Sequence, residues 1–206
     1  MRRGIYVVCA LALALCAAYA AAQNGPPADT LKVDYFSNSN NAIDETVHLT
    51  NPGTSGGNLC AAIYVFSADQ EMSECCSCYM TPDGLRTLSV NKDLLGNPLL
   101  GAIIYTGAIK IVSTTTTGTS CPTYPASITP TAGIRSWATH LQNNNILTET
   151  ESQDATLSTP EVYRLERECH AIQLDGSGKG VCTCGTGDAG AEIGPPPGPW
   201  APLGLE

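Results

Sequence analysis

Positively charged residues are scarce in this sequence. The 206-residue chain contains ten Lys and Arg against nineteen Asp and Glu, and its formal net charge is −9. Nucleic acids and anionic membranes bind proteins through a basic surface that displaces counterions. The charge balance therefore argues against both as partners. The acidic residues are scattered, as is typical of a solvated surface, and they do not form the DxDxDG loop of an EF-hand calcium site.

Several motifs of enzymes and cofactor proteins are also missing. The chain has no GxSxG nucleophile elbow, no paired histidine motif for zinc and no CxxCH haem motif. Its three histidines, His48, His140 and His170, belong to separate segments. Residues 176–180 lack the first glycine and the Ser or Thr of a phosphate-binding loop. We therefore expect no cofactor and no metal, and a secreted hydrolase with an unrecognised site remains an alternative.

The N-terminus has the three parts of an export signal in order. Arg2 and Arg3 precede an apolar run over residues 5–18, and small residues follow at Ala20 and Ala22. We predict a signal peptide over residues 1–22, cleaved after Ala20 or Ala22, and a linker over 23–29. The apolar run is short for a membrane span, so we expect a secreted, periplasmic or cell-surface protein without a span after cleavage.

Eight cysteines follow the signal, and their even number predicts a disulfide framework. Residues two apart in a strand point to the same side, so Cys76 and Cys78 should share a face, as should Cys182 and Cys184. The two segments are then suited to parallel bridges, while Cys75 needs a different partner from Cys76. A thiolate metal cluster and a redox-active thiol are the alternatives. The cysteines are Cys60, Cys75, Cys76, Cys78, Cys121, Cys169, Cys182 and Cys184.

Short β-strands between turn residues are expected from residue 30 to about 147. Leu31, Val33 and Tyr35 alternate with Lys32 and Asp34, which predicts a strand with one buried face. Residues 59–66 are apolar throughout and should form a central strand covered on both faces. Threonines at 114–117 predict an exposed loop. The pattern favours a mainly β fold, a single antiparallel β-sandwich of immunoglobulin-like or jelly-roll type over residues 30–187.

One α-helix is predicted near the C-terminus, over about 160–172. Ser158 and Glu161 form a capping box, and Leu165, Cys169 and Ile172 fall on one stripe. Residues 188–206 are rich in glycine and proline and predict an extended tail.

Three segments resemble those of a family of secreted bacterial proteins that has no established activity. They are 74–78 (ECCSC), 81–90 (TPDGLRTLSV) and 176–185 (GSGKGVCTCG). The resemblance covers residues 30–187. It implies export and a shared cysteine framework, and it assigns no activity, cofactor or site residue to this chain.

These features favour a secreted structural or interaction module of the bacterial cell surface or extracellular matrix. Its partner would be a protein or a glycan, and Tyr79 and Trp200 are the candidate contact residues. Tyr79 lies beside the cysteine cluster, where loops should be rigid, and Trp200 would dock the tail on a neighbouring copy. The second alternative is a subunit of an extracellular filament, in which the N-terminal arm or the tail docks on a neighbouring copy. Self-association is therefore an open expectation.

Overall fold

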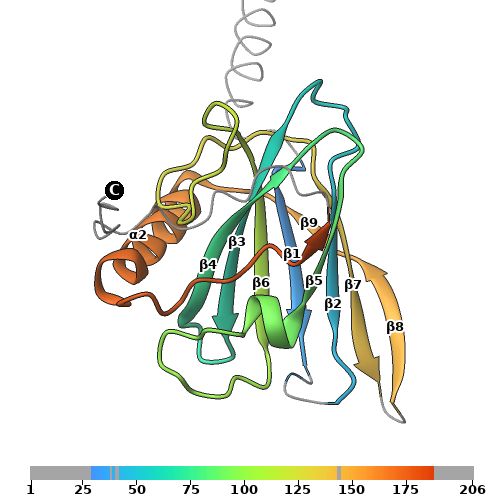
Figure 1. Cartoon of the computed structure of the whole chain (residues 1–206), viewed down its shortest axis with the longest axis vertical. Helices are drawn as coiled ribbons and strands as arrows, with labels where there is room; N and C mark the ends of the chain where they lie inside the picture. The colour runs from blue at the N-terminus through green and yellow to red at the C-terminus, as the bar shows by residue number, and fades with distance from the viewer. Residues whose placement is uncertain (1–28, 38, 40–41, 143–144, 188–206) are drawn as a thin grey trace, which may run out of the picture.

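In the residues that the structure describes, two five-stranded antiparallel sheets and one α-helix make up the fold (Figure 1). The structure is a computed structural model that describes residues 29–37, 39, 42–142 and 145–187. The predicted signal peptide, the tail with Trp200 and all of the linker except Asp29 lie outside these residues. The elements are β1 Leu31–Phe36, β2 Thr46–Thr50, β3 Leu59–Ser67, β4 Met72–Met80, β5 Leu85–Ser89, a π-helical turn Val90–Leu94, β6 Gly107–Thr115, β7 Arg135–Gln142, β8 Ile146–Glu151, β9 Gln153–Ala155, α2 Thr159–Asp175 and β10 Thr186–Gly187.

The strands form a sandwich whose sheets do not close into a barrel, which confirms the predicted fold class. Sheet A has the strand order β4-β3-β6-β1-β9, and sheet B has the order β10-β5-β2-β7-β8. β3 lies inside sheet A. Alternate residues of β3, such as Ile63, face sheet B, whereas Tyr64 and its neighbours on the other side belong to a second apolar cluster with α2. The prediction that 59–66 is covered on both faces is therefore confirmed.

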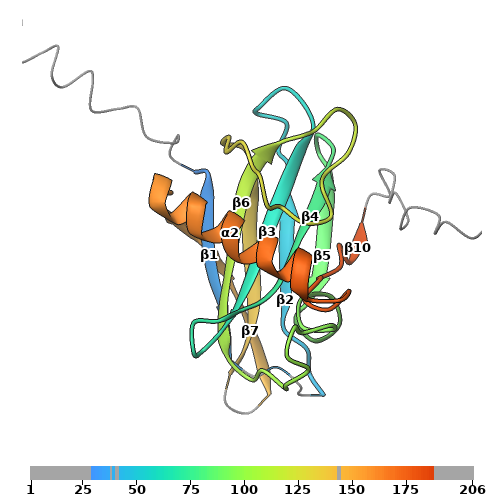
Figure 2. The same cartoon turned by 90° about the vertical axis from the view of Figure 1, so that its left-hand side faces the viewer.

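The helix α2 covers the outer face of sheet A and runs across its strands (Figure 2). It begins after Ser158, whose hydroxyl accepts a hydrogen bond from the Glu161 amide at 3.3 Å. Leu165, Cys169 and Ile172 are buried against the sheet as predicted. The helix is longer than the predicted 160–172, because three more residues follow Ile172 before the chain turns. No helix in the described ranges combines the length and the apolar character needed to cross a bilayer.

The strand β1 corrects one prediction. Lys32 and Asp34, expected in solvent, are 3% and 6% exposed, whereas Tyr35 is 50% exposed. The cause is that β1 pairs with β6 and β9 and turns its polar side toward sheet B. Lys32 forms an ion pair with Asp154, which lies directly opposite on β9 and whose pKa is lowered chiefly by this hydrogen bond. On the side of β1 that faces sheet B, Lys32 and Asp34 therefore contact polar side chains instead of water.

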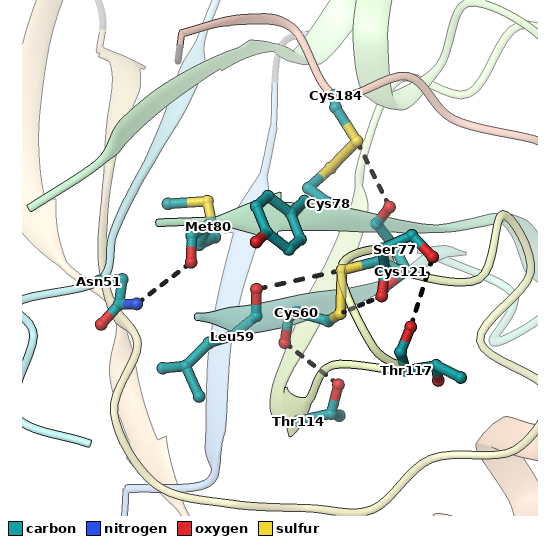
Figure 3. Close-up of a disulfide and its surroundings, with 12 residues drawn as sticks. Asn51, Leu59, Cys60, Ser77, Cys78, Met80, Thr114, Thr117, Cys121 and Cys184 are labelled. Atoms are coloured by element: carbon teal, nitrogen blue, oxygen red, sulfur yellow. Dashed lines mark hydrogen bonds between the residues drawn. A yellow bond between two sulfur atoms is a disulfide. The ribbon is translucent and has the colours of Figure 1, made fainter. Parts of the chain in front are cut away.

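The threonine run corrects another prediction. Thr114 and Thr115 belong to β6 and not to an exposed loop, and Thr114 is only 3% exposed. Its hydroxyl donates to the carbonyl oxygen of Cys60 on β3 at 3.2 Å (Figure 3). A buried hydroxyl with a backbone partner is as compatible with a strand as an apolar side chain.

Four disulfides join the eight described cysteines, and two of them are the parallel bridges to which the spacing of the CxC segments is suited. Cys76 and Cys78 bond to Cys182 and Cys184, both with a sequence separation of 106, so the two bridges run in parallel. Cys75 points to the other face of β4 and bonds to Cys169 on α2. The fourth bridge, Cys60–Cys121, ties the loop after β6 to β3 (Figure 3). Such a set is typical of proteins that fold in an oxidising compartment.

We predict that the protein without residues 1–22 has no reactive thiol, because all eight cysteines that follow this segment are in disulfides. Titration with a thiol reagent after denaturation without reductant should give a value close to zero per chain. A pair of reactive thiols per chain would contradict the disulfide framework.

Replacing Ile63 by Asp should lower the free energy of unfolding by at least about 3 kcal/mol. Ile63 is fully buried between the sheets, so the new carboxylate would have neither water nor a counterion. Urea unfolding measures the change. Ile63→Val is the matched control and should lose only about 1 kcal/mol. An Asp variant as stable as the Val variant would show that β3 is peripheral.

Candidate functional site

Two adjoining grooves lie at the end of the sandwich where the β3–β4 turn and residues 98–106 are found. These segments are at the lower end in Figure 1. The first has a volume of about 560 Å³ and lies between the β3–β4 turn and residues 98–106. The second has a volume of about 690 Å³ and lies beside β1, β6 and α2. Ser67, Ala68 and Thr106 line both grooves. Grooves of this size are the default location for a binding site.

Residues 98–106, which we call the apolar loop, form one wall of the first groove and contain no charged residue. Leu100, Ile103 and Tyr105 are 74%, 61% and 58% exposed. Large apolar side chains with this exposure on one short segment are unusual in a protein surface that has no partner. The loop therefore presents apolar surface to solvent at the rim of a cavity.

The ends of the apolar loop are fixed to the sandwich. The Leu99 amide donates to the Ser73 carbonyl oxygen on β4 at 3.1 Å. At the other end, the Ala68 amide donates to the Thr106 carbonyl oxygen, also at 3.1 Å. These bonds hold the wall of the groove in place, so little backbone order has to be created when the groove is filled.

The second groove has cations at its rim, but an acidic residue already pairs with them. Lys110 and Arg164 lie over the Phe66 ring, 5.4 and 4.9 Å from its centroid. Glu161 accepts hydrogen bonds from both, and its pKa is lowered to about 2, mainly by the Arg164 guanidinium. Glu168 also forms an ion pair with Arg164, so two carboxylates balance the two cations, and the groove is not a free anion site.

A buried carboxyl group, that of Glu74, lies next to residues that line the first groove. Glu74 on β4 is fully buried, and its Oε1 accepts from the Asn97 amide at 3.0 Å. Oε2 has no hydrogen-bond partner among the described residues. Burial raises the pKa of Glu74 to about 8, although the Asn97 amide and the Lys179 charge act in the opposite direction. Glu74 therefore holds the start of the apolar loop as a largely protonated acid at neutral pH.

Ser, Asp and His side chains also meet inside the sandwich, away from both grooves. Asp34 Oδ2 accepts from Ser152 Oγ at 2.6 Å, and Ser136 Oγ lies 2.7 Å from Ser152 Oγ. The other carboxylate oxygen lies 3.3 Å from His140 Nε2. The aspartate is thus between the serine and the histidine, whereas nucleophilic catalysis requires the histidine in the middle. The four residues are also buried, so this cluster is structural.

The structure places the predicted contact residues elsewhere. Tyr79 is half-buried within β4, opposite Cys60, and its carbonyl oxygen accepts from Arg86 Nε at 2.9 Å. It lines neither of the two grooves. Trp200 lies outside the described residues. Five of the disulfide cysteines lie on β3, β4 and α2, and their partners Cys121, Cys182 and Cys184 lie in the segments that follow β6 and α2. The described ranges contain no group of three or more His, Cys, Asp or Glu that could hold a metal ion.

The apolar loop is the candidate binding surface that the sequence did not predict. The apolar residues of this loop follow neither a helical nor a strand period, so their spacing predicts no secondary structure and no buried face. The available signal was a run of uncharged residues, 94–109, that contains glycines and a proline and still carries large apolar side chains.

Comparison of the chain with models of protein families, with curated proteins and with solved structures gave no match.

Glu74→Gln should make stability less dependent on pH. Between about pH 4.5 and 8 the folded state keeps a proton that the unfolded state has lost, so the free energy of unfolding falls as pH rises through this range. Gln stays neutral and can accept the same amide hydrogen bond. We expect the variant to match the native protein near pH 5 and to exceed it by a few kcal/mol near pH 8.5.

Urea unfolding at several pH values measures the difference, and the exposed Glu71→Gln is the control. Identical pH curves for the native protein and Glu74→Gln would show that Glu74 titrates normally.

Proposed function

We propose that this protein is a secreted interaction module of the bacterial cell surface or extracellular matrix, and that it binds a partner protein through the apolar loop and the first groove. The observation that carries the proposal is the exposure of Leu100, Ile103 and Tyr105 on one loop beside a cavity. The export signal predicted for residues 1–22 and the four disulfides support the extracellular part of the proposal.

A protein partner suits the first groove better than a glycan does. Its lining is chiefly aliphatic, with Met72 and Ile104 beside the exposed loop residues, and Tyr105 is its one aromatic side chain. Sugars need aromatic platforms as well as polar side chains, and the groove has polar side chains such as Asp69 and Glu71 but only this one ring. Apolar side chains of a partner segment can instead fill such a groove as anchors, each of which contributes about 1 kcal/mol or more.

Photocrosslinking in the organism that produces the protein tests this function. A photoreactive amino acid at position 103 should yield an adduct with a second protein, because Ile103 is exposed at the groove rim. The matched control is position 174, since Leu174 is 67% exposed on α2 and does not line the groove. Absence of an adduct at 103, or the same adducts at both positions, would contradict the proposal.

The purified partner then allows affinity to be measured. Serine at positions 100, 103 and 105 together should weaken binding about 100-fold, because three apolar anchors are lost. The variants Leu174→Ser and Tyr163→Ser, at exposed apolar positions of α2, should bind as the native protein does.

A further inference from the structure

The strand β8 is a long sheet edge that the described structure leaves open. It contains six residues, all exposed, and its one neighbour among the described strands is β7 (Figure 1). The other three edges are protected. β9 and β10 have only three and two residues, and β4 is covered where the Cys75 amide donates to the Gly180 carbonyl oxygen at 2.9 Å. An open edge is a template for another extended chain.

Side-chain contacts hold β8 firmly against β7. Thr150 Oγ1 lies 2.9 Å from His140 Nε2, and Thr148 Oγ1 accepts from Gln142 Nε2 at 3.1 Å. Residue Ser152, which follows β8, is anchored by its amide to the Ser136 carbonyl oxygen at 3.0 Å. The edge is thus preformed, and a strand that adds to it does not have to order it first.

The charges on β8 determine which kind of extended segment can pair with this edge. Leu147, Glu149 and Glu151 alternate with the threonines and share the opposite face of β8. Neither glutamate has an ion pair or a side-chain hydrogen bond among the described residues. Two carboxylates spaced two residues apart on an open edge attract a strand that carries basic residues at the same spacing.

A second copy of this chain is a poor occupant. Antiparallel pairing of two β8 strands around a two-fold axis brings the same faces together. In the two registers that pair most of the strand, Glu149 lies opposite either another Glu149 or the apolar Leu147. Neither neutralises it, and like charges directly opposite destabilise a strand pair. The glutamates therefore prevent self-pairing and leave the edge open to a partner of opposite charge.

We infer that β8 binds an extended segment of a partner protein that carries Lys or Arg at alternate positions, by adding it as a further strand of sheet B. Backbone hydrogen bonds to β8 supply the alignment, and ion pairs with Glu149 and Glu151 supply the selectivity. This surface is separate from the apolar loop, and neither proposal depends on the other.

A synthetic seven-residue peptide that alternates lysine with threonine and valine tests the inference. Hydrogen exchange should show slower exchange of those backbone amides of residues 146–151 that point away from β7 when the peptide is present, because strand addition occupies them. A peptide with the same charges and proline at the intervening positions should give no protection, since it cannot complete the backbone ladder. No protection by the first peptide, or equal protection by both, would overturn strand addition.

The charge requirement is tested by fluorescence anisotropy with the labelled lysine peptide. Glu149→Gln combined with Glu151→Gln should weaken binding at least about fivefold. Asp83→Asn combined with Asp175→Asn removes the same charge at exposed positions away from β8 and should change binding less than twofold. Equal weakening in both variants would mean that the peptide responds only to net charge, which would overturn the assignment of β8.

Discussion

The crosslinking of β4 is the constraint on which the rest of the structure depends. One strand carries three half-cystines, with Cys75 turned toward α2 and Cys76 and Cys78 turned toward sheet B. The helix is therefore bonded to one face of the strand, and the C-terminal segment 182–184 to the other. A small apolar core alone would leave the order of these layers less strongly determined.

The sequence predicted the elements in which hydrophobic period and burial agree. β3 is apolar on both sides and is buried on both sides. The helix α2 has a capping residue at its start, one apolar stripe along its length and glycines after its last turn. For β1 the strand itself was predicted correctly, but the solvent exposure of its polar side was not. Alternation separates apolar from polar residues, but it does not show whether a polar side chain contacts water or a buried polar partner. Lys32 and Asp34 have such partners on segments more than 100 residues away, Asp154 and Ser152, which local patterns do not encode.

The candidate site was harder to predict than the fold. Tyr79 was a reasonable choice, since an aromatic residue beside rigid cysteines suits recognition, but the alternation that sets the cysteine pairing also places Tyr79 within the sheet. The apolar loop has no period, and its importance comes only from the exposure of its side chains in three dimensions. The open edge at β8 likewise depends on strand order. Both surfaces arise from what the tertiary fold leaves uncovered.

The long separation between the paired cysteines determines the order in which the fold can close. As the chain is made from its N-terminus, Cys75, Cys76 and Cys78 are present long before Cys169, Cys182 and Cys184, and the two parallel bridges each span 106 residues. During that interval three neighbouring thiols are available to one another and to Cys60 and Cys121. Correct pairing of the three β4 cysteines thus has to wait until α2 and the segment that follows it have been made. Any early, incorrect disulfide among these thiols accordingly has to be reshuffled before the fold can be completed.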